Sequence, residues 1–213
     1  FDPIGFKSRV LIVGDSDPGY SGVIHCLDAL SGRTLFEVNT PACIGKQPLV
    51  VDNTAYLALE SVAGDRLMAM RIAGRNAGTT LWSVPLKTAQ VDAPVLSMID
   101  TQDGRRLVVK TDTGALMGLC PKDGATIWET SLLEGGEVLL SNLELCTLDG
   151  HLLVAEHVVS LIDPATGHRV QRIENLPVHP SMLIVGKGLN VCVGEGDDHL
   201  EFFRLGGFLA LLE

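Results

Sequence analysis

One short segment of this sequence recurs at nearly even intervals, and this recurrence limits the available folds more than any other feature. Leu27–Gly32, followed by Phe36, returns as Leu119–Gly124 followed by Trp128, and again as Ile162–Gly167. The marker glycines stand at 32, 78, 124, 167 and 207, at intervals of 46, 46, 43 and 40 residues. A steady period of this length is typical of proteins built from stacked copies of one supersecondary unit.

The segments between the markers are short, β-rich and divided by turn residues. In the third copy the runs are Val95–Ile99, Leu107–Thr111, Leu116–Leu119 and Thr126–Thr130. The breaks between them carry Asp and Gly, which tolerate positive φ. A four-stranded antiparallel unit of this length is typical of a propeller blade. The sequence therefore predicts an all-β fold, a β-propeller or propeller arc of about five four-stranded blades.

The repeat boundaries follow from the same period. We expect one propeller domain over residues 1–213, with approximate repeats at 1–40, 41–86, 87–132, 133–174 and 175–213. Pro48 and Pro94, also 46 residues apart, each open an apolar run in phase with the glycines. Two markers that keep the same interval strengthen the assignment.

The recurring turn and the aromatic residue after it each have a physical explanation. The carboxylate of an Asp in the turn can accept N–H bonds from residues further on, and the later Gly takes a left-handed conformation. The aromatic residue four positions after the Gly is suited to packing between blades, with stacking on a ligand as the alternative. The predicted structural markers are Asp28, Gly32, Phe36, Gly78, Trp82, Gly124, Trp128, Asp163 and Gly167.

This pattern resembles the pyrroloquinoline-quinone-type propeller repeat, in which a Pro-led strand precedes Leu-Asp-x-x-Ser/Thr-Gly and an outer-strand aromatic residue. The quinone dehydrogenases of that family are longer, with eight blades, a calcium ion, a catalytic Asp and a disulfide between adjacent cysteines. This sequence has no adjacent cysteine pair. The resemblance therefore implies a non-catalytic member without a cofactor, and the family includes a propeller lipoprotein that assists outer-membrane protein assembly.

Other motifs with chemical potential are incomplete. Val13–Ser16 is similar to the nucleophile block of Gly-Asp-Ser hydrolases, but the partner Asp-x-x-His is missing. Two acidic clusters could hold calcium but lack further oxygens at fixed spacing, and the six histidines are dispersed. These clusters are Asp15 with Asp17, and Glu195 with Asp197 and Asp198. We predict no catalytic residue and no metal site.

Charge and cysteine usage restrict the partners. A net charge of −10 disfavours nucleic acid, and no apolar run reaches the length of a helical membrane span. The five cysteines stand singly, which favours reduced, buried thiols and a compartment such as the cytoplasm, with the periplasm as the alternative. The expected partner is another protein or a neighbouring domain.

The second strand of the first repeat is a candidate binding edge. Counting back from Gly32, the outer strand covers residues 34–38, the third 23–27 and the second 9–14, and no clear inner strand precedes them. An unpaired edge invites strand addition by a partner. The candidate residues are Val10, Leu11, Ile12 and Val13.

Three functions stay open on the sequence alone. A protein-interaction scaffold, or one domain of a larger protein, agrees best with a propeller repeat that lacks catalytic motifs. The alternatives are a propeller that senses a small ligand or ion, and a fragment of a quinone-dependent dehydrogenase.

Overall fold

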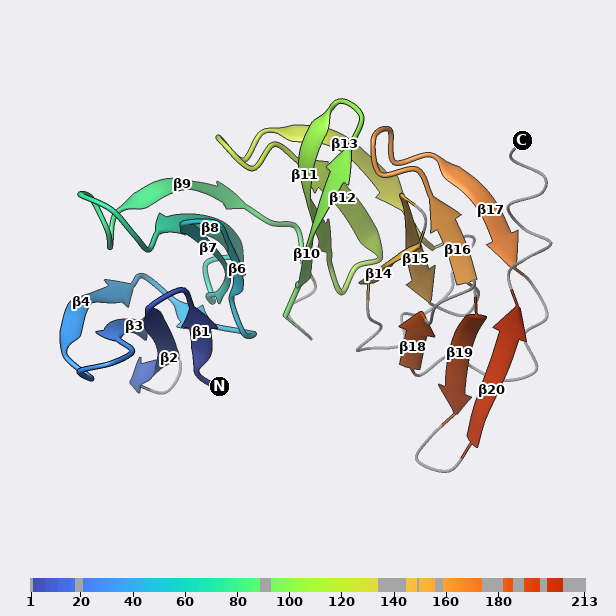
Figure 1. Ribbon diagram of the computed structural model, residues 1–213. Coiled ribbons are helices and arrows are strands. Elements are labelled where there is room, and N and C mark those ends of the chain that lie inside the picture. The colour runs from blue at the N-terminus through green and yellow to red at the C-terminus, as the bar shows by residue number, and fades with distance from the viewer. Residues whose placement is uncertain are drawn as a thin grey trace. The chain divides into compact units, whose positions relative to one another are not determined.

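The structure is a computed structural model in which all regular structure is β. It describes residues 2–17, 21–88, 93–133, 145–148, 150–155, 159–173, 182–185, 190–195 and 199–204. Twenty strands and no helix lie within these residues (Figure 1). The same residues accordingly offer no helical membrane span. The all-β prediction is confirmed.

The strands form antiparallel sheets whose members follow each other in sequence. The first sheet contains β1 (Ile4–Phe6), β2 (Arg9–Asp17), β3 (Ser21–Asp28) and β4 (Thr34–Thr40). The second contains β5 (Cys43–Ile44), β6 (Leu49–Val51), β7 (Thr54–Glu60), β8 (Arg66–Arg71) and β9 (Thr80–Pro85). The third contains β10 (Val95–Thr101), β11 (Gly104–Lys110), β12 (Ala115–Leu119) and β13 (Thr126–Ser131).

The later repeats give two further sheets. The fourth contains β14 (Leu145–Leu148), β15 (His151–Ala155), β16 (Val159–Ile162) and β17 (Arg169–Ile173). The fifth contains β18 (Met182–Val185), β19 (Asn190–Glu195) and β20 (His199–Arg204). A fourth strand for the last sheet and the repeat copy at Gly207 were predicted after β20, outside the described residues.

The first strand of the second sheet is broken into two pieces. Both β5 and β6 pair with β7, and Gly45–Pro48 separates them. Pro48 has no N–H to give to the ladder, so pairing resumes after it, at Leu49. The predicted Pro-led strand is therefore only the second half of the inner strand of this sheet.

A register shift recurs between the third and fourth strands of the first four sheets. It follows Cys26 in β3, Ala69 in β8, Gly118 in β12 and Leu161 in β16. Such a bulge leaves one residue of the outer strand without a cross-strand partner. In three sheets this unpaired residue is aliphatic and at least one-third exposed, namely Leu35, Leu81 and Ile127.

The chain divides into two compact units by its contacts. The first unit holds residues 1–96, 111–113 and 120–125, and the second holds 97–110, 114–119 and 126–213. The predicted single domain and its repeat boundaries stay predictions.

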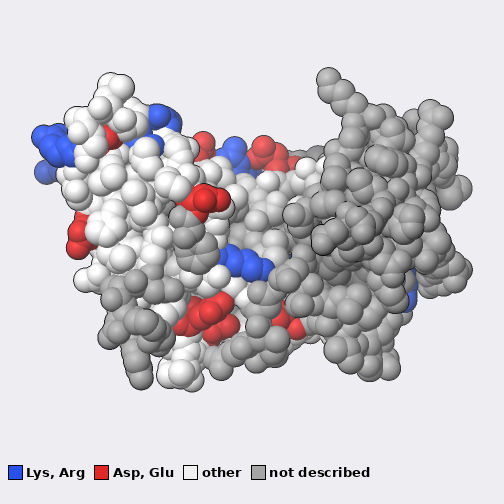
Figure 2. Space-filling model, turned by 90° about the horizontal axis from the view of Figure 1, so that it is seen from below, with Lys and Arg blue, Asp and Glu red and all other residues white. Residues whose placement is uncertain are grey.

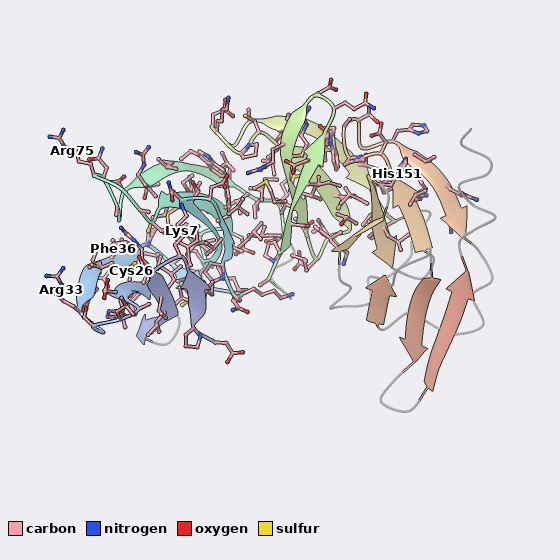
Figure 3. All side chains as sticks on the ribbon, in the orientation of Figure 1. Lys7, Cys26, Arg33, Phe36, Arg75 and His151 are labelled. Carbon is pink, nitrogen blue, oxygen red and sulfur yellow. The ribbon has the colours of Figure 1, made fainter. Side chains whose placement is uncertain are left out.

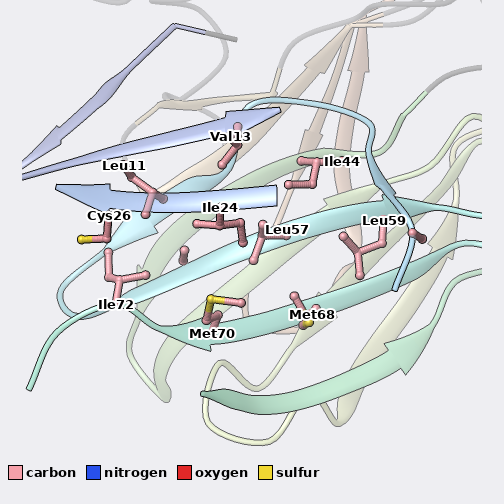
Figure 4. Close-up of a cluster of buried hydrophobic side chains, with 12 residues drawn as sticks. Leu11, Val13, Ile24, Cys26, Ile44, Leu57, Leu59, Met68, Met70 and Ile72 are labelled. Atoms are coloured by element: carbon pink, nitrogen blue, oxygen red, sulfur yellow. The ribbon is translucent and has the colours of Figure 1, made fainter. Parts of the chain in front are cut away.

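Each unit has its own apolar core. In the first unit, buried side chains of β2, β3 and β5 pack against those of β7 and β8 (Figure 4). These include Leu11, Ile24, Ile44, Leu57 and Met70. In the second unit, Val108 and Leu116 of the third sheet pack with Leu152 and Val154 of the fourth. Neighbouring sheets are therefore joined by apolar contacts within each unit.

Candidate functional site

The turn between β3 and β4 is organised by Asp28. Its Oδ1 accepts hydrogen bonds from Leu30 N–H (3.2 Å), Ser31 N–H (2.8 Å) and Ser31 Oγ–H (2.7 Å). The N–H of Gly32 donates to Asp28 O at 2.9 Å, and Gly32 has a left-handed φ of 69°. The backbone N–H of Ser31 is the main cause of a lowered pKa at Asp28, and the Ser31 hydroxyl is the next largest.

The equivalent turn of the fourth sheet repeats this geometry around Asp163. Its carboxylate accepts bonds from Ala165 N–H (2.9 Å) and Thr166 Oγ–H (2.7 Å), while Gly167 takes a φ of 73°. Partial burial by itself would raise the pKa of Asp163, but the Thr166 and Ala165 hydrogen bonds outweigh it and the pKa is lowered. Both Asp residues therefore stabilise turns in their charged form.

The other two turns depart from this pattern in different ways. In the third sheet, Cys120 replaces the Asp, and Asp123 accepts from Ala125 N–H at 3.0 Å. In the second sheet, Arg71 holds the Asp position, and Gly78 N–H donates to Arg71 O across seven residues rather than four. This turn therefore has three additional residues.

Trp82 of β9 packs on the turn that follows β12. Its side chain is 9% exposed, and its Nε1–H donates to Pro121 O at 3.0 Å. A Cβ built on Gly124 would lie 2.7 Å from Cε3 of Trp82. The hydroxyl of Tyr56 also donates to Pro121 O, at 3.4 Å, and its ring centroid is 6.0 Å from that of Trp82.

The same contact recurs one repeat later. Trp128 is 8% exposed, donates from Nε1 to Pro164 O at 3.0 Å, and would lie 2.4 Å from a Cβ on Gly167. In the first repeat, Phe36 Cδ2 would lie 3.3 Å from a Cβ on Gly78. Each marker aromatic therefore covers the marker glycine of the next repeat.

The predicted binding edge on β2 requires a correction. β1 pairs with β2 in the register Ile4–Leu11, Gly5–Val10 and Phe6–Arg9, across a two-residue turn in which Lys7 has a φ of 54°. The prediction that no inner strand covers Val10 and Leu11 is therefore wrong. The sequence segment looked too short, but three residues are enough when a tight hairpin sets the register.

Pairing with β1 stops at Ile12 for a local reason. In this register Pro3 stands opposite Ile12, and Pro has no N–H for the ladder. No described strand pairs with Ile12 or Val13 on this inner side, although both pair with β3 on the other. Their role as a partner edge stays a prediction.

The remaining candidate ligands are not gathered into a site. Among the described residues, no group of three His, Cys, Asp or Glu could hold a metal ion. The last residues of β2 include Asp15, Ser16 and Asp17, whose side chains the structure does not describe. The described residues also exclude Asp197 and Asp198. Cys26 is buried, which raises the pKa of its thiol, whereas Cys43 and Cys120 are partly buried.

Three buried charged residues had no signal in the repeat pattern. Asp65, 3% exposed, accepts hydrogen bonds from Ser61 N–H and Thr88 Oγ–H at one end of the second sheet. Arg106 and Lys110 are 9% and 5% exposed on β11. Arg106 and Lys110 lie four residues apart and so on the same face of β11, but the three apolar residues between them hide this alternation in the sequence.

Comparison with known protein families identifies the family to which the repeat belongs. The family model described as "Outer membrane protein assembly factor BamB" matches residues 2–160 and, in a second alignment, residues 69–195. A search of curated proteins finds no significant match.

Solved structures with the same fold are distant in sequence. BamB from Moraxella catarrhalis matches with a TM-score of 0.72 and 15% identity over 97% of this chain and 61% of that one. The computationally designed protein Ika8 gives 0.67 and 13%, over 95% and 57%. A quinohemoprotein alcohol dehydrogenase from Pseudomonas putida HK5 gives 0.52 and 14%, over 82% and 34%. These likenesses confirm the β-propeller or propeller-arc fold, and this chain spans less than two-thirds of each of the three.

Proposed function

The chain belongs to the family of the outer membrane protein assembly factor BamB, and from this premise we propose that it is a non-catalytic propeller that binds other proteins. The observation that carries the proposal is the inner edge of β2. This strand has nine residues, but β1 pairs with only Arg9, Val10 and Leu11. The edge beyond Leu11 offers backbone groups to an added strand.

Strand addition at this edge has a defined register. Phe6 and Arg9 flank a two-residue turn and form a hydrogen-bonded pair, and Leu11 repeats that orientation. The N–H of Val13 therefore faces the open side, while its side chain, 3% exposed, stays in the core. A strand in line with β1 can pair here without moving the core.

The proposal is tested by hydrogen exchange of the full chain with a partner captured from its native source. We expect the Val13 amide to gain protection in the complex, and Ile12→Lys to weaken capture because a charged edge opposes strand pairing. Val62→Lys is the matched control, since Val62 is 95% exposed in the turn between β7 and β8. Equal capture by both variants, with no added protection at Val13, would reject this edge.

The enzyme alternative is separated by a second assay. The chain lacks adjacent cysteines, which in the quinone dehydrogenases of the resembling family cover the cofactor. We expect no thermal stabilisation by a quinone with calcium and no alcohol-dependent dye reduction. A positive result in either assay would reject the scaffold hypothesis in favour of a quinone-dependent dehydrogenase. Thermal stabilisation by another small ligand would favour a ligand-sensing propeller.

A further inference from the structure

Four turns lie together at one end of the first two sheets, within the first unit. They are Lys7–Ser8, Asp28–Arg33, Asp52–Asn53 and Arg71–Gly78, and we call this surface the turn end. Three hydrogen bonds connect these turns, and a fourth joins Arg9, the first residue of β2, to the last of them. The bonds are Ala29 N–H to Ser8 O (2.8 Å), Ile72 N–H to Asn53 O (2.8 Å), Lys7 Nζ to Asn53 Oδ1 (3.1 Å) and Arg9 to Ile72 O (2.8 Å).

The turn end carries basic charge in a chain whose net charge is −10. Its basic residues are Lys7, Arg9, Arg33, Arg71 and Arg75, and its acidic residues are Asp28 and Asp52. One Asp28 oxygen already accepts three bonds from its own turn. The turn end therefore has a local excess of positive charge, although the chain as a whole is negatively charged.

Among the described residues, no ion pair is formed by four of these cations, namely Lys7, Arg33, Arg71 and Arg75. After the larger effect of the Ser31 hydrogen bonds, the nearby charge of Arg33 also helps to lower the pKa of the Asp28 carboxyl. The bond from Lys7 to Asn53 is to a neutral amide. Arg105, in contrast, contacts Asp100 at 2.8 Å. Figure 3 shows Arg33 and Arg75 extending outward from their turns, and Figure 2 shows a group of basic side chains at one corner of the face it displays.

The basic residues coincide with the departure from the repeat. The turn between β8 and β9 has three additional residues, and Arg71 stands where other repeats have Asp or Cys. The extra segment brings the exposed Arg75 to the turn end. Loops that depart from the scaffold are where binding residues concentrate.

An exposed apolar residue on the same surface indicates the kind of partner. Leu30, within the Asp28–Gly32 turn, is 95% exposed beside the exposed Arg33. Arginine next to an apolar side chain is typical of protein interfaces, whereas a polyanion such as DNA gains nothing from an exposed leucine. The combination favours an acidic protein segment.

We propose that the turn end binds an acidic segment of a partner protein that also presents an apolar side chain to Leu30. This surface is distinct from the open edge of β2, so the proposal goes beyond strand addition and can hold or fail independently of it. Each exposed cation would face a carboxylate, and the contact would weaken as salt rises.

The test is a titration of a fluorescein-labelled, glutamate-rich peptide with one central leucine against the full chain. We expect Arg33→Glu and Arg75→Glu each to weaken binding about fivefold or more, the effect of one charge contact at 4 Å in water. Leu30→Ser should weaken binding at both low and high salt. Lys87→Glu is the matched control, because Lys87 is exposed beyond β9, away from the turn end.

Three results would overturn the proposal. The first is an equal loss with Lys87→Glu, which would make the effect one of net charge alone. The second is no binding of the peptide by the unaltered chain at low salt. The third is binding of duplex DNA or of phosphatidylglycerol vesicles in preference to the peptide. Circular dichroism of each variant would establish that these surface substitutions leave the fold intact.

Discussion

The indole of Trp128 occupies the space directly above Gly118. The two residues are cross-strand partners in β13 and β12, and a Cβ built on Gly118 would stand 2.2 Å from Cε2 of the ring. The matching positions in the first two sheets pair Cys26 with Phe36 and Ala69 with Trp82. A small residue at this position therefore lets the aromatic side chain lie over its own sheet while its edge reaches the next turn.

Replacing Gly118 by Ala should destabilise the chain by about 1–3 kcal/mol, the usual cost of overpacking a filled core. The added methyl group would displace the Trp128 ring from Pro164 O, to which it donates. Urea unfolding of Gly118→Ala measures the loss. The double variant Gly118→Ala/Trp128→Leu should show a smaller effect of the alanine, and strict additivity of the two changes would contradict the clash.

Truncation of either tryptophan to Ala should cost about 3–5 kcal/mol, because each fills a buried position between a strand and the following turn. Trp82→Phe should cost less, since it keeps one aromatic ring and loses the second ring together with the hydrogen bond to Pro121. Leu81→Ala is the control, because Leu81 is 39% exposed at the bulge. Unchanged denaturant midpoints in Trp82→Ala and Trp128→Ala would instead favour a ligand-stacking role.

Substitutions at two marker glycines distinguish the cost of backbone strain from the cost of a steric clash. Gly32 and Gly167 have φ angles of 69° and 73°, but only Gly167 has a close neighbour, Trp128 Cε3 at 2.4 Å from a built Cβ. Gly32→Ala should cost about 1–2 kcal/mol from the left-handed backbone alone. Gly167→Ala should cost distinctly more in the same thermal-unfolding measurement. Equal losses would mean that the indole yields easily.

The Asp163 turn should make stability depend on pH in the acid range. Its folded-state pKa is lowered, so ionised Asp163 stabilises the fold above its unfolded pKa of about 3.9, and this contribution is lost as pH falls through the folded pKa. Asp163→Asn should lower Tm at neutral pH. The difference from the unaltered chain should shrink below about pH 4. A constant difference down to pH 2 would contradict the assigned charge effect.

The sequence allowed the strands to be located but not all of their partners. The predicted runs of the third repeat match β12 and β13 to within one residue at each end, because alternation and Asp-Gly turns are local signals. The run at 107–111 overlaps β11, but that strand begins three residues earlier, at Gly104. β1 was missed because three residues carry no period. Its place is set by the Lys7 turn and by contacts with the second sheet, such as Gln47 Nε2 to Asp2 O at 3.4 Å.

The contacts between repeats and the basic turn end were harder to predict, because they also depend on residues far apart in the sequence. The repeat pattern located Trp82 in the sequence. It did not predict the contact between Trp82 and Gly124, 42 positions later, because that contact depends on how successive sheets pack. Similarly, Lys7, Arg33 and Arg75 are scattered in sequence. Only the bonds that join their turns, such as that of Lys7 to Asn53, reveal one surface.

The open edge of β2 predicts a sharp change in hydrogen exchange between neighbouring residues of the isolated chain. Leu11 N–H faces β1 and pairs with Ile4, whereas Val13 N–H faces the same side beyond the end of β1. Ile12 N–H points to β3, where Ile12 pairs with His25. We therefore expect slow exchange at Leu11 and Ile12 and fast exchange at Val13.

The register of β1 provides the control for this measurement. Ile4→Pro removes the N–H that faces Leu11 and restricts φ within the three-residue strand, so it should loosen β1 and speed exchange at Leu11. Exchange at Ile12 should change little, because its bond is to β3. If Val13 is instead as slow as Leu11 in the isolated monomer, the edge is already covered by the chain itself. Strand addition at β2 would then be excluded, because no backbone donor would be left there to receive a partner.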